Sequence, residues 1–130
     1  MEVVPFAPEH LFQLDPGPFD KKHIEPLKGV PLTGSSIFHG GRCLGVFFFT
    51  DLNGGVVRFH LFASDELRRK YGRFLARTCR DGIERAKEWG VEILEGEVDV
   101  EFTEARRFAE WLGFVSVAQE GSVKIYRKVL

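Results

Sequence analysis

The chain has 130 residues, a length that suits one domain with a single hydrophobic core. Hydrophobic residues make up 44% of the chain and charged residues 28%, and both values are ordinary for a globular protein. The net charge of −1 excludes a chain whose overall field recruits nucleic acid, so any basic surface must be local. The longest apolar run, Val46 to Phe49, is too short to cross a bilayer.

The cysteines and histidines show no pattern typical of a metal site. Cys43 and Cys79 stand far apart without a CxxC motif, which predicts two buried thiols in a reducing compartment. The four histidines lack metal-ligand spacing, so no metal is expected. The first six residues lack the basic and apolar regions of a secretory signal. Together these features predict a cytoplasmic protein.

The first half of the chain predicts mainly strands. Residues 1–6 read as a short strand and residues 8–12 as a brief helix, whereas residues 15–28 predict a loop with a short helical piece. Residues 36–38, 43–50 and 56–63 predict three more strands, joined by glycine-containing turns. The strand at 43–50 is apolar almost throughout, which is typical of a strand covered on both faces.

The second half predicts helices alternating with strands. Apolar residues at three- and four-residue steps predict an amphipathic helix over residues 65–89, with Ser64 as N-cap and Gly90 just beyond its end. Gly72 inside that helix would cost about 1 kcal/mol, so it needs a structural reason. A strand at 91–100 follows, then a helix at 104–112 capped by Thr103 and closed by Gly113. The last part predicts a hairpin of strands 114–118 and 123–129.

This order of elements predicts an α+β fold. Meander strands followed by a β-α-β-α-β unit imply a mixed, mostly antiparallel sheet flanked by helices in three layers. We expect residues 1–130 to form a single domain.

A cluster of cations opens the predicted long helix. Cations are disfavoured at a helix N-terminus, whereas the free N–H groups there bind anions. Two interpretations stay open: a phosphate site, or a solvated basic face partly balanced by nearby acids. Three of the arginines, at 69, 73 and 77, are expected to share one face of that helix. The cations are Arg68, Arg69, Lys70, Arg73, Arg77 and Arg80.

The sequence of this cluster resembles the pyrophosphate-binding segment of the GNAT N-acetyltransferases, [Gln/Arg]-x-x-Gly-x-[Gly/Ala]. Residues 69–74 match at Arg69 and Gly72 and carry Phe74 at the final small position. A register beginning at Arg68 would instead put Tyr71 at the first Gly. The resemblance implies that acetyl-CoA is the cofactor, with its pyrophosphate on this segment and its thioester beside the preceding strand. The implied cofactor-binding residues are Leu61, Phe62, Ala63, Arg68, Arg69, Lys70, Gly72 and Arg73.

Residues 102–114 resemble a second GNAT segment, Asn-x-x-Ala-x-x-x-Tyr-x-x-x-Gly-Phe. Ala105 and the Gly113-Phe114 pair are kept, whereas Phe102 replaces the Asn and Ala109 replaces the Tyr that often serves as general acid. This segment and residues 3–11 also resemble GNAT-like proteins encoded by bacteriophages. The resemblance therefore implies a divergent phage or prophage member of that superfamily.

Candidates for proton transfer are few. His60 lies on the strand where a GNAT general base often projects. Tyr126 or Tyr71 could replace the missing acid, although packing roles are the simpler interpretation of all three residues. The alternating acids Glu95, Glu97, Asp99 and Glu101 predict a solvated strand face, with recognition of a cationic amine as the alternative.

The resemblance leaves three functional hypotheses. The first is transfer of an acetyl or other acyl group from acyl-CoA to an amine of a small molecule or protein. The second is an inactive GNAT-fold structural or accessory protein of a phage or prophage, with virion components as partners and a virion-associated location. The third, a basic-helix module for nucleic acid, is disfavoured by the net charge. A homodimer is a further expected partner, and no membrane is expected.

Overall fold

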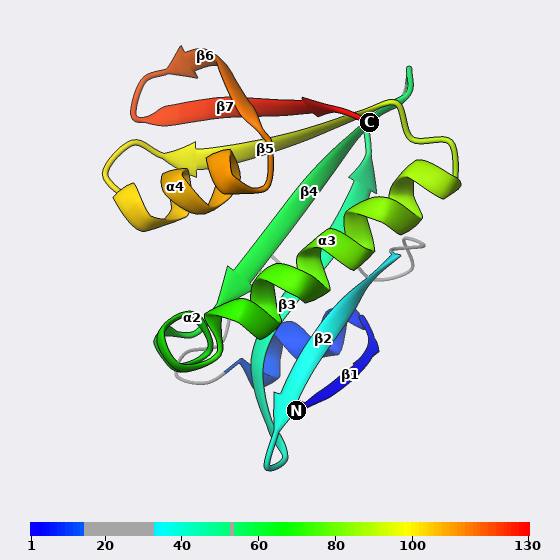
Figure 1. Ribbon diagram of the computed structural model, residues 1–130, viewed down its shortest axis with the longest axis vertical. Coiled ribbons are helices and arrows are strands. Elements are labelled where there is room, and N and C mark those ends of the chain that lie inside the picture. Colours follow the sequence, from blue (N-terminus) through cyan, green and yellow to red (C-terminus); the bar gives the residue numbers. More distant parts are fainter. Residues whose placement is uncertain (15–32, 53) are drawn as a thin grey trace. The chain divides into compact units, whose positions relative to one another are not determined.

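The computed structural model describes residues 1–14, 33–52 and 54–130. Its strands form one seven-stranded sheet in the order β1-β2-β3-β4-β5-β7-β6, with helices beside it (Figure 1). The predicted mixed α+β class is confirmed, and the loop expected at 15–28 lies outside the described residues. The chain divides into two compact units. Unit 1 is Met1–Thr50 with His60–Gly82, and unit 2 is Asp51–Phe59 with Ile83–Leu130. This division does not test the single-domain prediction.

Unit 1 begins with an antiparallel meander. β1 (Glu2–Pro5) pairs with β2 (Thr33–His39), which pairs with β3 (Arg42–Asp51). The β2–β3 turn uses two glycines, at φ 58° and 78°, as the sequence predicted, because these backbone angles favour residues without a Cβ. The brief helix predicted after β1 is a 3₁₀ helix, η1 (Pro8–Gln13).

The apolar strand β3 is buried on both faces, which confirms its prediction. One face joins a cluster formed by Phe6, Leu11, Cys43, Val46 and Phe48. The other face receives the helices that follow β4. A Cβ on Gly82 would lie 2.5 Å from the Phe47 ring, so the absence of a side chain there lets the helix pack closely on the strand.

The prediction of one long helix over residues 65–89 is wrong at one point, because the helix breaks at Tyr71. α2 (Asp65–Lys70) ends there, where Tyr71 has φ −125° and ψ 31°, and α3 (Gly72–Glu88) begins at the next residue. Gly72, a poor helix former, therefore stands at a helix start and not in an interior. The predicted caps are confirmed: the Ser64 hydroxyl accepts the Leu67 N–H at 3.1 Å, and Gly90 has φ 88°.

Unit 2 is built on the C-terminal strands. The first residues of β4 (Val56–Ala63) pair in parallel with β5 (Ile93–Asp99), while β7 (Val123–Val129) pairs antiparallel with both β5 and β6 (Val115–Glu120). α4 (Thr103–Trp111) includes Thr103 as its first residue, with Phe102 at the N-cap. The predicted Thr103 cap is therefore wrong by one residue, whereas Gly113 ends the helix as expected, at φ 98°.

Candidate functional site

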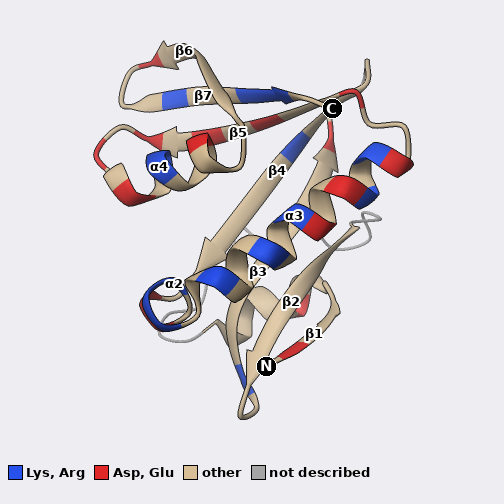
Figure 2. Cartoon of the chain, in the orientation of Figure 1, with Lys and Arg blue, Asp and Glu red and all other residues tan. Residues whose placement is uncertain are grey.

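The basic segment, Arg68–Arg73, runs from the middle of α2 into the start of α3, where Figure 2 shows blue bands. Arg69, Lys70 and Arg73 are exposed. None of these three makes a hydrogen bond or ion pair with another residue in the described part of the chain. Because no carboxylate neutralises them, they can bind an anion.

The two acidic residues of α2 are already engaged by arginines. Asp65 forms an ion pair with Arg68, and Glu66 accepts a hydrogen bond from Arg42 at 2.9 Å. Among the described residues, Arg68 therefore has an acidic partner, unlike Arg69, Lys70 and Arg73. The sequence alone does not distinguish these four cations. The predicted shared face of arginines 69, 73 and 77 also assumed one unbroken helix, and the break at Tyr71 removes that basis.

The break places a new helix N-terminus inside the basic segment. The Leu75 N–H bonds to the Tyr71 carbonyl at 3.0 Å, so the N–H groups of Gly72, Arg73 and Phe74 lack an acceptor one turn earlier. A Cβ on Gly72 would meet no atom within 4 Å, which leaves open space beside the backbone. Free N–H groups, an open approach and unpaired cations thus occur together.

The parallel pairing of β4 with β5 ends before β4 itself ends. Their parallel pairing covers Val56–Arg58 of β4 and ends at the Arg58–Glu95 rung. Leu61, Phe62 and Ala63 follow beyond that rung and are half-buried. The strand then leaves the sheet at Ser64, whose N–H donates to the Leu44 carbonyl at 2.8 Å. Unpaired strand backbone can bind a carbonyl oxygen through its N–H groups.

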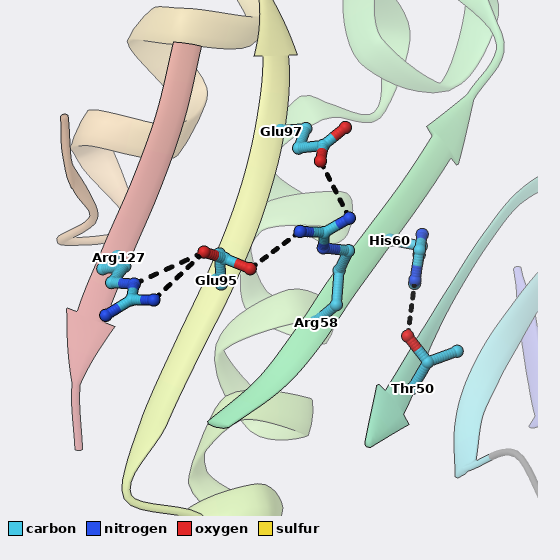
Figure 3. Close-up of polar contacts among 6 residues, drawn as sticks. All are labelled: Thr50, Arg58, His60, Glu95, Glu97 and Arg127. Atoms are coloured by element: carbon cyan, nitrogen blue, oxygen red, sulfur yellow. Dashed lines mark hydrogen bonds and ion pairs between the residues drawn. The ribbon is translucent and has the colours of Figure 1, made fainter. Parts of the chain in front are cut away.

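His60 is held by ring packing and by hydrogen bonding. Its ring stacks on Phe48 with centroids 4.6 Å apart, and its Nε2 lies 2.9 Å from the Thr50 hydroxyl (Figure 3). The tautomer decides which of the two groups donates. These contacts support the simpler reading of a packed histidine, and its role as a base stays a prediction.

Tyr126 is buried, with only 1% of its surface exposed. Its hydroxyl has no hydrogen-bond partner among the residues that the structure describes, and its backbone pairs with Gly96 and Ser116. Tyr126 belongs to unit 2, whereas His60 and the implied cofactor-binding residues belong to unit 1. Its role as an acid therefore stays a prediction.

An ion-pair network in unit 2 was not predicted from the sequence. Arg58 binds Glu95 and Glu97, each at 2.8 Å, and Arg127 approaches Glu95 at 3.3 Å (Figure 3). The hydrogen bond from Arg58 is the main cause that lowers the pKa of Glu95 from its ordinary value, against the opposing effect of burial. The prediction of a solvated acidic face is wrong at Glu95, whose side chain is only 9% exposed.

The network also bears on amine recognition. Both Glu95 and Glu97 are paired with arginine, so neither offers an uncompensated charge to a cationic amine. The signal that could have revealed this was Arg58, the one Lys or Arg in the largely apolar strand β4. A cation in such a place is expected to have a buried partner.

The cysteines are both buried and unlinked, as predicted, and burial raises the pKa of the Cys79 thiol to about 12. In the described ranges, no three His, Cys, Asp or Glu residues are grouped so that they could hold a metal ion. None of the described helices is both long and apolar enough to cross a membrane.

Comparison with known proteins finds matches to the structure but none to the sequence. No protein-family model matches the chain, and no curated protein matches it. Solved structures do match. An IAA acetyltransferase from Bacillus cereus superposes with a TM-score of 0.75 at 15% identity, over 99% of each chain. The GNAT domain of S. lividans PAT has a TM-score of 0.72 at 15% identity, over 98% of this chain and 89% of that one.

The fold is that of the GNAT acetyltransferases. A third GNAT-fold neighbour, a Bacillus subtilis acetyltransferase in complex with CoA, has a TM-score of 0.70 at 16% identity, over 99% of this chain and 97% of that one. At such identities the likeness establishes the fold alone. The neighbours give no support to a phage or prophage origin, which stays a prediction.

Proposed function

We propose that this GNAT-fold protein is an acyl-CoA-dependent N-acyltransferase, and that the basic segment holds the phosphates of its cofactor. The observation that carries the proposal is the helix break at Tyr71. It sets the free N–H groups of the α3 N-terminus between Lys70 and Arg73, two cations without a described partner. A chain that needed only an amphipathic helix would gain about 1 kcal/mol from a better helix former than Gly72.

The residues present fit a diphosphate-containing cofactor in two respects. Arg69, Lys70 and Arg73 supply uncompensated positive charge, and the space beside Gly72 lets a ligand approach the backbone. Phe74 departs from the small residue usual at its position. It is half-buried, and its carbonyl accepts the Thr78 hydroxyl at 2.8 Å. The groups that fit the diphosphate are therefore the backbone N–H groups and the cations that precede the Phe74 side chain.

The chemistry of transfer follows from the strand that precedes the basic segment. Acyl-CoA would supply a thioester carbon open to attack by an amine. The backbone at Leu61–Ala63, which has no pairing with β5, would donate N–H groups to the carbonyl oxygen as negative charge develops on it. His60 is the proposed base for the incoming amine and Tyr126 the proposed acid for the departing thiolate. The acceptor is an amine of a small molecule or of a protein.

A second candidate function is a GNAT-fold protein without catalysis. Two observations favour it. Tyr126, the candidate acid, is buried at 1% exposure, and the Nε2 of His60 is already bonded to Thr50. In this alternative the protein serves as a structural or accessory component, and a phage or prophage setting remains part of that proposal. It predicts no release of free CoA thiol from acetyl-CoA with any amine.

Thermal unfolding with acetyl-CoA tests the cofactor part of the proposal. A ligand at 100 times its Kd stabilises the folded state by about 2.7 kcal/mol. We expect a rise in Tm with acetyl-CoA, and release of free thiol when an amine acceptor is added. Absence of any shift at millimolar acetyl-CoA would contradict the proposal. A shift without thiol release across a panel of amines would favour the non-catalytic alternative.

The variant Gly72→Ala separates a ligand role from a helical role. The added methyl meets no protein atom within 4 Å, so folding is preserved, and α3 gains up to about 1 kcal/mol in the free energy of unfolding. The same methyl fills the approach to the N–H groups, so acetyl-CoA affinity falls. Calorimetric titration and urea unfolding measure the two effects. Unchanged affinity would show that Gly72 does not face the cofactor.

A further inference from the structure

Glu66 lies in the first turn of α2, close in sequence to the basic segment, and its carboxylate is bonded to a residue from another element. Arg42, the first residue of β3, donates to Glu66 at 2.9 Å. The two side chains are 48% and 31% exposed, respectively. An ion pair with this exposure adds at most about 1 kcal/mol to the free energy of unfolding. Stabilising the fold is therefore only a small part of what this pair can do.

The β2–β3 hairpin makes two further contacts with α2 and with the residue that follows it. The ring of His39, the last residue of β2, lies 5.5 Å from that of Tyr71, the residue at the helix break. A Cβ on Gly45 would lie 2.5 Å from a methyl of the fully buried Leu67. All of these residues belong to unit 1. The hairpin thus meets α2 at its first turn, its middle and its end.

The Arg42–Glu66 pair affects the net charge around α2, and that charge determines how strongly the basic segment attracts an anion. Between residues 64 and 74 the chain carries two acids, Asp65 and Glu66, against four cations, which gives 4 − 2 = +2. Arg68 pairs with Asp65 from within α2, and Arg42 pairs with Glu66 from outside it. Including Arg42 raises the local charge to +3. Without Arg42 the Glu66 carboxylate would be uncompensated within a Debye length of the phosphate-binding groups.

We propose that Arg42 is a positioning residue for the cofactor: by binding Glu66 it neutralises that carboxylate and fixes α2 against the hairpin, so that the basic segment accepts an anion. The inference rests on the proposed function, since it concerns the same site. Arg42 acts through Glu66 and is not placed in contact with the ligand. The proposal therefore predicts that the effect of losing Arg42 depends on the presence of the Glu66 charge.

A double-mutant cycle with Arg42→Met and Glu66→Gln tests this dependence. Calorimetric titration at low salt gives the Kd for CoA and, separately, for inorganic pyrophosphate. Arg42→Met is expected to weaken binding about two- to fivefold, which is the range that an exposed charge pair covers. Glu66→Gln in the Arg42→Met background is expected to restore the Kd to within about twofold of the original protein. The Arg42→Met effect should shrink at high salt, because exposed charges are screened.

Two controls keep the outcomes apart. Arg107→Met removes an exposed arginine from α4, with the same change in net charge, and should leave the Kd unchanged. Thermal unfolding should give similar Tm values for all variants. Equal binding by Arg42→Met and the original protein, or no recovery in the double variant, overturns the inference while the proposed function stands. Binding of neither CoA nor pyrophosphate by the original protein overturns both. Binding of pyrophosphate alone refutes the proposed cofactor, and the cycle then decides the inference with that probe.

Discussion

Two groups of charged side chains in this protein show opposite behaviour. In unit 2, Arg58 and Arg127 are paired with Glu95, whose carboxylate is almost buried. In unit 1, Arg69 and Arg73 are exposed and have no partner among the described residues. Charge satisfied inside the protein contributes to the fold, whereas charge without a partner is available to a ligand. The comparison predicts that substitutions in the first group change stability and those in the second change affinity.

The largest effect is expected from Arg58→Met. The substitution leaves the Glu95 carboxylate buried, with only the longer contact from Arg127, and breaking a buried pair in this way costs about 3 kcal/mol in the free energy of unfolding. Urea unfolding measures the loss. The matched control is Arg127→Met, whose arginine is 43% exposed and should cost less than about 1 kcal/mol. Equal losses in both variants would mean that burial of the pair is not what stabilises unit 2.

The second effect concerns affinity. Arg69→Gln combined with Arg73→Gln removes two unpaired charges from the basic segment, so acetyl-CoA should bind at least about tenfold more weakly. The free energy of unfolding should change by less than about 0.5 kcal/mol, because neither arginine has a described partner to lose. Calorimetric titration and urea unfolding check the two values. A large loss of stability with unchanged affinity would reverse the comparison between the two groups.

The sequence predicted the strands and the general fold better than it predicted these charges. A nearly continuous apolar run and the turn glycines were sufficient for β3 and its hairpin, because both signals are local. The break at Tyr71 escaped prediction because the apolar period continues through it, and only Gly72 indicated a discontinuity. The burial of Glu95 escaped because its partners, Arg58 and Arg127, are distant in the chain. Pairing between distant residues depends on strand register, which alternation alone does not fix.

The smallest effect is a dependence of stability on pH. Arg58 lowers the pKa of Glu95 in the folded protein below the ordinary value of 4.5. A carboxyl group with a lowered folded pKa stabilises the protein above its unfolded pKa, and that stabilisation is lost as the pH falls through the folded pKa. Glu95→Gln should therefore be less stable than the original protein by about 1 kcal/mol at pH 7. The difference should shrink as the solution is acidified below pH 4.5.

Urea unfolding of both proteins at pH 7 and at pH 3 measures this difference, with Glu97→Gln as the control. Glu97 also binds Arg58, but its side chain is 47% exposed and solvent screens its charge. Its substitution should change stability by a few tenths of a kcal/mol at either pH. If Glu97→Gln matched Glu95→Gln at both pH values, exposure would not distinguish the two carboxylates. The stabilising charge would then be that of Arg58, shared equally between two acceptors.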